Sequence, residues 1–249
     1  MKPRAILFLT TVAAVLALGG VPALAVTKRC EPDRSCIGTS KDDRLIGSAG
    51  NDNMQGGRGD DKLLGRAGDD NAMRGDGGND TLRGGPGRDH LGGGPGTDVL
   101  EGGPDFDFYF FEQGWGKEEI VDTPVLDTDI NTGHQVRFDG VTDDLTIRLT
   151  SEAGPEVKNK TKSSTLDWDA DLVDVVIDGK GDDTITGREV GDNIQLFYPG
   201  NNVVFALGGD DFVYSRNGGG GDVIDCGAGD KDEVRMDAGD TQVNCEVLT

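Results

Sequence analysis

Aspartate recurs at a fixed spacing through the first half of the chain, and such an array of carboxylates could hold cations. Eight aspartates share this spacing: Asp43, Asp52, Asp61, Asp70, Asp80, Asp89, Asp98 and Asp107. Ca²⁺ takes about six to eight oxygen ligands at about 2.4 Å, whereas Mg²⁺ demands tighter octahedral geometry and keeps its waters. Zinc and copper sites need His or Cys, and no His or Cys cluster accompanies the aspartates. The pattern therefore favours calcium.

Each aspartate is the sixth residue of a nine-residue unit. Eight units run from Gly38 to Phe110 with Arg74 as one extra residue, and each unit begins with glycine. The eighth residue of each unit is apolar: Leu45, Met54, Leu63, Ala72, Leu82, Leu91, Leu100 and Tyr109. One apolar residue in nine cannot form a core alone, so the units must stack on copies of themselves.

The unit divides into a strand and a turn. Positions seven to nine alternate around the apolar residue, as a short strand does, and the glycines of positions one to five suit a turn with positive φ. Two units then make one coil of eighteen residues, with the sixth residues stacked in two columns about 4.8 Å apart from coil to coil. The columns are Asp43, Asp61, Asp80, Asp98 and Asp52, Asp70, Asp89, Asp107. Carboxylates at this spacing repel, so positive charge is expected between the turns.

The units resemble the GGxGxDxUx nonapeptide of the RTX, or haemolysin-type calcium-binding, repeat family. The resemblance covers Gly38 to Phe110, with Lys41 and Asp105 standing where the family has its fourth glycine. It implies an all-β fold, a parallel β-roll or β-helix-like solenoid, with several Ca²⁺ ions held between stacked turns. The segment CGAGDKDEVRMDAGDTQVNCE also resembles the closing segment of secreted actinobacterial RTX-repeat proteins. A glycine-rich, acidic tail that never folds is the alternative, but low complexity predicts composition without phase.

A less regular form of the repeat returns after residue 176. Its sixth positions are Asp183, Asp192, Asn202, Asp211 and Asp222. The four aspartates are predicted metal ligands, and Asp183 and Asp211 are the better candidates because each follows a turn glycine, Gly181 or Gly209. Asn202 brings no charge.

Between the two repeat regions, QVRFDGV, LTIRLT and LVDVVID alternate apolar and polar residues as strands do. We expect a non-repeat β insertion or wider coils on the same solenoid, with a separate small domain as the alternative. The predicted organisation is residues 1–25 signal peptide, 26–37 N-terminal disulfide cap, 38–110 repeats, 111–176 β insertion, 177–225 degenerate repeats and 226–249 C-terminal disulfide cap.

The N-terminal segment predicts export. Residues 1–25 carry Lys2 and Arg4, an apolar run and an Ala23-Leu24-Ala25 cleavage site, which is typical of a secretory signal peptide. An uncleaved anchor is the alternative. We expect an extracellular protein with no membrane span in its mature chain. A net charge of -22 argues against nucleic acid and anionic membranes as partners and in favour of calcium ions.

Four cysteines lie near the ends of the mature chain: Cys30, Cys36, Cys226 and Cys245. In an exported protein this pattern suggests two local disulfides, which would close solenoid ends that otherwise expose strand edges. A zinc site made from the four thiols is the alternative, and the long separation of the pairs argues against it.

Few residues suggest catalysis. His90 and His134 are interpreted as solvated surface residues. Asp167, Asp169 and Asp171 around Trp168 could cleave a glycoside as a carboxylate pair, but alternating acids are more often solvated or in contact with calcium. No GxSxG, HExxH or P-loop spacing occurs. We therefore expect a secreted calcium-binding protein that folds around Ca²⁺ and is not an enzyme; the alternatives are a small carbohydrate-active enzyme, lyase-like or epimerase-like, and a cell-surface adhesin.

Overall fold

The structure is a computed structural model, which describes residues 24–31, 34–121, 134–143, 145–148, 156–159, 165–168, 173–229 and 231–247. The predicted signal peptide lies almost entirely outside this range. The described residues form strands and turns without a helix. Within the same ranges, no helical segment has the length and apolarity needed to cross a membrane.

Two sheets run along the whole molecule. Sheet A contains, in spatial order, β1 (Thr27–Arg29), β3 (Arg44–Ile46), β5 (Lys62–Leu64), β7 (Thr81–Arg83), β9 (Thr97–Glu101), β11 (Lys117–Ile120), β15 (Thr165–Trp168), β14 (Glu156–Asn159), β13 (Leu145–Arg148), β17 (Thr184–Thr186), β19 (Val203–Phe205), β21 (Val223–Asp225) and β23 (Thr241–Val243). Sheet B contains β2 (Ser35–Ile37), β4 (Asn53–Arg58), β6 (Ala72–Gly77), β8 (His90–Gly92), β10 (Phe108–Glu112), β12 (His134–Gly140), β16 (Val173–Ile177), β18 (Asn193–Gln195), β20 (Phe212–Ser215), β22 (Glu233–Met236) and β24 (Glu246–Val247).

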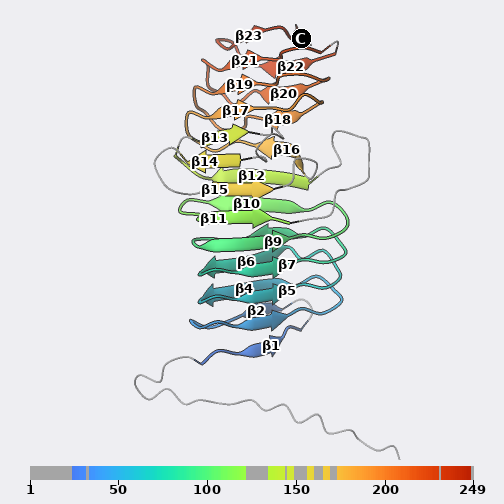
Figure 1. Ribbon diagram of the computed structural model, residues 1–249, viewed down its shortest axis with the longest axis vertical. Helices are drawn as coiled ribbons and strands as arrows, with labels where there is room; N and C mark the ends of the chain where they lie inside the picture. The colour runs from blue at the N-terminus through green and yellow to red at the C-terminus, as the bar shows by residue number, and fades with distance from the viewer. Residues whose placement is uncertain are drawn as a thin grey trace, which may run out of the picture.

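The chain alternates between the two sheets, so that each pair of strands closes one coil. Figure 1 shows the coils stacked along the long axis, from β1 at the blue end to β23 at the red end. Neighbouring coils pair in parallel and in register, for example Leu45 with Leu63 and Leu63 with Leu82. The all-β parallel β-solenoid predicted from the repeat is therefore confirmed.

The segment between the repeat regions continues the solenoid. Strands β10, β11 and β12 add parallel strands to the stack, while β13, β14 and β15 pair antiparallel with one another. The outer members of this meander, β15 and β13, pair in parallel with β11 and β17. The expected β insertion is thus part of sheet A, because its edges continue the ladders on both sides.

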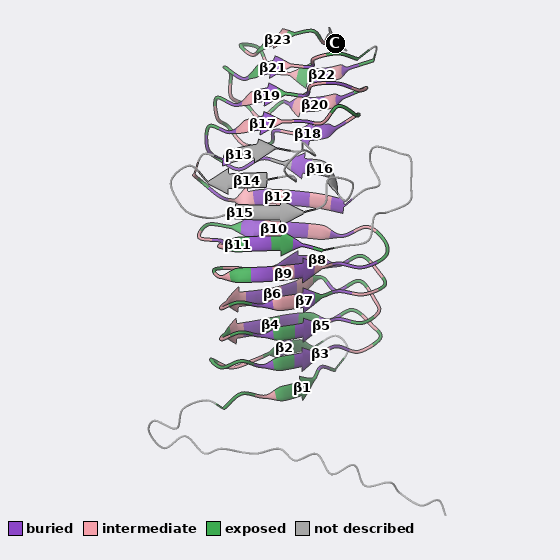
Figure 2. Cartoon of the chain, viewed as in Figure 1, coloured by how far each residue is buried: buried purple, intermediate pink, exposed green. Residues whose placement is uncertain are grey.

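Apolar side chains from both sheets fill the space between them, and Figure 2 shows buried residues recurring on strand after strand of the stack. The eighth residues of the repeat lie there with almost no exposure, and the prediction fails at one unit. Ala72 is only partly buried, and Met73 lies in the core in register with Met54 and Leu91. The extra residue of the repeat array therefore precedes Met73 instead of following it, since a methionine fills a core position that an alanine would leave empty.

The glycines of the turn serve two different purposes. Positive φ angles occur at the second and fourth positions, as at Gly57 and Gly59. The first glycine of a unit does not have this conformation. A Cβ added at Gly56 would lie 2.7 Å from the carbonyl oxygen of Gly75 and 2.9 Å from the Asp61 carboxyl carbon. The first glycine is required because the next coil approaches its Cα closely, which the sequence prediction had attributed to φ alone.

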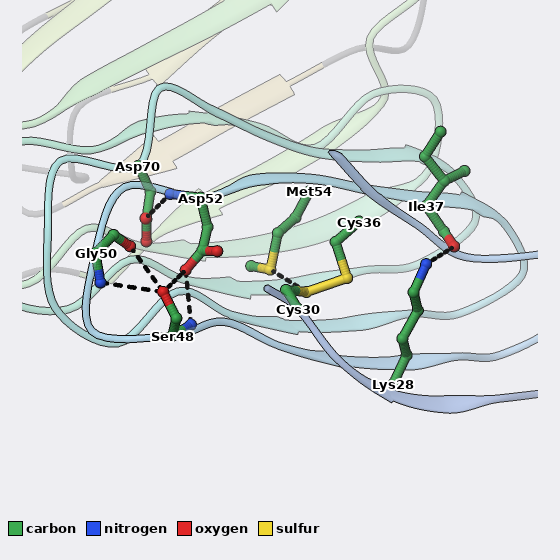
Figure 3. The surroundings of a disulfide bond; sticks show 9 residues. All are labelled: Lys28, Cys30, Cys36, Ile37, Ser48, Gly50, Asp52, Met54 and Asp70. Carbon is green, nitrogen blue, oxygen red and sulfur yellow. Dashed lines mark hydrogen bonds between the residues drawn. A yellow bond between two sulfur atoms is a disulfide. The ribbon is translucent and has the colours of Figure 1, made fainter. Parts of the chain in front are cut away.

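Disulfides close both ends of the core, as predicted. Cys30 bonds to Cys36, and Cys226 bonds to Cys245. Figure 3 shows the N-terminal pair beside Met54, with 3.5 Å between the Cys30 and Met54 sulfurs. Cys36 and Cys226 are fully buried members of the hydrophobic core. The disulfides therefore cover apolar surface at the ends that no further coil covers.

Candidate metal centre

The aspartates of the repeat form two continuous columns, one beside each sheet. In both columns the backbone N–H of one aspartate donates to Oδ1 of the aspartate one coil later in the chain. In the first column the N···O distances are 2.6 Å for Asp43 to Asp61, 2.7 Å for Asp61 to Asp80 and 2.6 Å for Asp80 to Asp98. In the second column, the bonds from Asp52 to Asp70, Asp70 to Asp89 and Asp89 to Asp107 are each 2.8 Å long. The predicted pairing of alternate units is thus correct.

All eight carboxylates are buried, with at most 3 % of each residue exposed. One oxygen of each interior aspartate takes part in the column bond, and the other needs a partner of its own. The Oδ2 atoms of Asp61, Asp70 and Asp80 are buried without a hydrogen-bond partner. A buried charged oxygen without a partner is strongly unfavourable, so these three positions call for a positive group.

The pKa values of these carboxylates are raised for the same reason. Burial raises the pKa of Asp61 to about 6 and that of Asp70 and Asp80 to about 7. The column bonds from the backbone N–H groups of the preceding coil oppose this increase, and the neighbouring carboxylates of the column add to it. A cation placed beside these oxygens would favour their charged form.

Backbone carbonyl oxygens lie next to these carboxylates. A Cβ built on Gly65 would lie 2.7 Å from the carbonyl oxygen of Gly84 and 3.1 Å from Cγ of Asp70, an arrangement equivalent to that around Gly56. The first glycines of the units from Gly38 to Gly84 are therefore each flanked by a carboxylate of their own unit and a carbonyl of the next coil, whereas Glu118 replaces the carbonyl at Gly93. Both are hard oxygen donors of the kind that Ca²⁺ prefers, so the residues fit this ion.

The carboxylates are spread along the columns rather than gathered in a cluster. Within the part of the chain that the structure describes, no group of three or more His, Cys, Asp or Glu side chains is placed to hold a metal ion. Side chains of that kind are what a zinc site requires. The oxygens that the columns bring together come from one carboxylate per unit and the turn backbone.

The first coil differs from those that follow. The Oδ2 atoms of Asp43 and Asp52 accept hydrogen bonds from the backbone N–H groups of Thr39 and Ser48, and the Ser48 hydroxyl adds a bond of 3.1 Å to Asp52 (Figure 3). Protein groups thus bind both oxygens of Asp43, whereas Asp52 keeps its Oδ1 buried without a hydrogen-bond partner.

Two residues outside the predicted repeat extend the columns. Glu118 pairs in register with Asp98 and is buried, and burial together with the Asp98 carboxylate raises its pKa to about 9. Gly114, Gly116 and Ile120 flank it at the spacing of the second, fourth and eighth residues of a unit. A search that accepted Glu at the sixth position would have found this ninth unit.

His134 continues the second column. Its Nδ1 accepts the Asp107 N–H at 3.2 Å, and the side chain is fully buried. The interpretation of His134 as a solvated residue is wrong, because the ring occupies the position that a carboxylate holds in other coils. His90 is also not fully solvated: it is half-buried and its ring lies 4.4 Å from that of Phe108.

The second half contains the same columns with different partners. Asp183, Asp192, Asp211 and Asp222 are buried, and their columns continue through Asn202, Asp232 and Asp240. Asp232 was missed because the coil before it is lengthened to 21 residues. Asp240 follows Asp222 at the regular spacing of 18 residues, but it lies in the segment that was predicted to be the C-terminal cap. Asp178 was missed because it stands at a first position, where burial raises its pKa to about 8.

Side chains of the protein bind several of these carboxylates. Arg188 Nε lies 2.6 Å from Asp192 Oδ1, and Ser215 and Asn217 donate to Asp222 Oδ2 at 3.1 and 3.0 Å. Asp211 resembles the first-half sites: its Oδ2 is buried without a hydrogen-bond partner, and burial raises its pKa to about 7. Asp183, the other preferred candidate, instead has both carboxylate oxygens bonded to backbone N–H groups, those of Leu145 and Gly179. The choice among these ligands stays a prediction.

The carboxylate cluster considered for catalysis lies partly outside the described residues. Asp169 and Asp171 lie outside the described residues, and for Asp167 and Trp168 the structure describes only the backbone, as part of β15. Their predicted role stays a prediction.

Comparison with known protein families agrees with the geometry. The RTX calcium-binding nonapeptide repeat matches the chain in four copies, over residues 37–72, 74–109, 170–189 and 198–220. A search of curated proteins finds no match.

Proposed function

We propose, from the premise that four segments of this chain are RTX calcium-binding nonapeptide repeats, that the protein is secreted and folds around Ca²⁺ outside the cell. The observation that carries the proposal is the set of buried carboxylate oxygens without partners at Asp61, Asp70 and Asp80. Calcium supplies the positive charge that these oxygens lack. The candidate ligands of the first half are the eight column aspartates, and those of the second half are Asp183, Asp192, Asp211 and Asp222.

The chain contributes the geometry of these sites. The column hydrogen bonds fix each carboxylate by its Oδ1 atom, which leaves Oδ2 directed at the first glycine of its unit. The Oδ2 atom can lie this close to the first glycine only because glycine has no Cβ. In the unfolded chain these oxygens are dispersed, so binding free energy becomes folding free energy.

Secretion is supported by the signal-like residues 1–25 and by the two disulfides, which form in oxidising compartments. The proposal includes no catalytic role. The buried carboxylates have pKa values typical of active sites, but they face the glycines of the stacked turns, where ion binding accounts for them.

Far-UV circular dichroism of the oxidised mature protein during a Ca²⁺ titration tests the proposal, with Mg²⁺ as the parallel control. We expect a transition from coil to β structure at roughly 0.1 to 1 mM Ca²⁺, the range of extracellular calcium modules. The same concentrations of Mg²⁺ should leave the spectrum unchanged. A spectrum that is rich in β structure in chelator and does not respond to Ca²⁺ would contradict the proposal.

A further inference from the structure

Arginines gather on the outer face of sheet A, although acidic residues outnumber basic ones by 46 to 24 in the chain. A groove of about 550 Å³ on this face is lined by Arg29, Arg44, Arg66 and Arg83. Its lining contains one acidic residue, Glu101, which lies 2.9 Å from Arg83. Among the described residues, no carboxylate forms an ion pair with Arg29, Arg44 or Arg66.

The strand register sets the length of the groove. Arg29, Ile46, Leu64, Arg83 and Glu101 occupy equivalent positions on β1, β3, β5, β7 and β9. Because strands lie about 4.8 Å apart, this row spans about 19 Å. This row is much longer than a single small anion, so its length suits an extended ligand that carries several charges.

Like charges lie side by side along the same face. Arg44 and Lys62 are direct register partners on β3 and β5, and neighbouring like charges destabilise a sheet. Asp42, Asp43 and Asp60 line a separate pocket with Arg44 and Lys62 at the start of the two strands. They precede the strands, whereas Arg66 and Arg83 lie at or beyond the strand ends.

Arg66 is held in an unfavourable backbone conformation. It stands at the second position of its unit with φ of 91°, where Gly57, Gly85 and Gly94 have the same left-handed conformation without strain. A side chain larger than glycine costs about 1 kcal/mol or more there. Backbone strain of this kind is often associated with function, and here it places a guanidinium in the groove.

We propose that this groove binds an acidic oligosaccharide that carries sulfate or carboxylate groups. Planar guanidinium groups form paired hydrogen bonds with both kinds of anion. Ile46, Leu64 and Pro86 supply an apolar floor against which the faces of sugar rings can pack. The described lining contains no aromatic ring, so the bases of a single-stranded nucleic acid would have no stacking platform.

Fluorescence anisotropy with the calcium-loaded mature protein and a labelled heparin octasaccharide tests the proposal. We expect binding that weakens severalfold between about 50 and 200 mM NaCl, because the contacts are between exposed charges. Maltooctaose, a neutral chain of the same length, should not compete. The absence of any octasaccharide binding at the lower salt concentration would overturn the proposal.

Matched triple variants locate the site. Arg29→Gln, Arg44→Gln and Arg66→Gly together should weaken binding by about tenfold or more, since several exposed ion pairs are lost at once. The control triple of Arg58→Gln, Arg88→Gln and Arg216→Gln removes three exposed arginines elsewhere and loses the same charge. Equal losses in the two triples would refute a defined groove.

The single variant Arg66→Gly separates binding from folding. It relieves the backbone strain, so the thermal midpoint should stay the same or rise, while binding should weaken about threefold or more. Unchanged binding would remove Arg66 from the site. A single-stranded DNA octamer is the last comparison: binding as tight as that of the octasaccharide would overturn the choice of a sugar ligand.

Discussion

The two repeat regions of the roll both bury carboxylates, but the partners of these carboxylates differ between the regions. In both, a carboxylate from each unit is buried beside the next coil. Between residues 38 and 110 the interior aspartates keep an oxygen without a hydrogen-bond partner, as at Asp61 and Asp80. Between residues 177 and 225, protein groups contact some of the equivalent oxygens. The Arg188 backbone N–H donates to Asp192 Oδ2 and the Ser215 hydroxyl to Asp222 Oδ2, whereas Oδ2 of Asp211 is again buried without a partner.

Under the proposed function, this difference predicts that the second region depends less on calcium than the first. At Asp192 an arginine contacts the carboxylate, and at Asp222 a hydroxyl and an amide do so. Asn202 instead removes the negative charge from its column position. The fold survives because the column hydrogen bonds and the core are the same in both regions. We therefore expect the first region to respond to calcium more strongly than the second.

The largest expected effect is the pH dependence of the calcium-free protein. Burial raises the folded-state pKa of Asp61 to about 6 and of Asp70 and Asp80 to about 7, from an ordinary value of 3.8. The stability that these groups contribute is therefore fully present below pH 3.8 and is lost as the pH rises through 6 to 7.

In chelator, the roll should thus be more folded at pH 5 than at pH 8, as measured by circular dichroism. Calcium should reverse this order, because it binds the deprotonated carboxylates. Asp211 and Asp178 add pKa values of about 7 and 8 in the second region, so the loss should extend there to a smaller degree. Stability that increases with pH in chelator would contradict the assigned shifts.

A pair of double variants compares the two regions directly. Asp61→Asn with Asp80→Asn keeps an oxygen acceptor for the column bonds and removes two charges. The increase in unfolding free energy on adding calcium should fall by about 3 kcal/mol, the value of losing saturated binding at about 100 times Kd.

Asp192→Asn with Asp222→Asn is the matched control, with the same change of charge in the second region. Its calcium-dependent increase in unfolding free energy should change by less than about 1 kcal/mol, because protein groups already contact these carboxylates. Urea unfolding at calcium concentrations just above and well above the folding transition measures both increments. Equal decreases would show that the two regions use calcium alike.

The smallest expected effect concerns the arginine that occupies a column site. Arg188→Gln leaves the buried Asp192 carboxylate without its guanidinium partner. At the lowest calcium concentration that keeps the protein folded, this should lower the unfolding free energy by about 2 kcal/mol. Adding more calcium should restore part of the lost unfolding free energy. Arg235→Gln breaks a more exposed ion pair with Glu233 and should cost less than about 1 kcal/mol. If calcium raises the unfolding free energy of the Arg188 variant no more than that of the Arg235 variant, Arg188 does not take the place of the ion.

The phase of the sequence repeat was sufficient to predict the fold and the two columns. Glycine, aspartate and an apolar residue at fixed positions determine which residues stack, and Asp61 lies beside Asp80 for that reason. The phase could not reveal substitutions that keep the geometry and change the chemistry. Glu118 and His134 take column positions because each has an acceptor atom in the right place.

Other features depended on packing that no short pattern encodes. The placement of Met73 rather than Ala72 in the core follows from the volume available between the sheets. The contacts of Arg188 and Ser215 with their aspartates depend on side-chain conformations in lengthened coils, where the repeat no longer fixes the spacing. The row of arginines on sheet A was missed because its members lie far apart in the sequence and converge only through register.

The column hydrogen bonds also make the two ends of the roll chemically unlike. Each bond runs from an N–H to the carboxylate of the following coil, so a bare N-terminal end would present acceptors and a bare C-terminal end would present donors. Two uncapped rolls could then join head to tail, a contact that repeats without closing and builds a filament. The Val26 N–H already occupies Asp43 Oδ1, and the two disulfide loops lie across the ends. We therefore expect removal of the caps to favour end-to-end association of the roll.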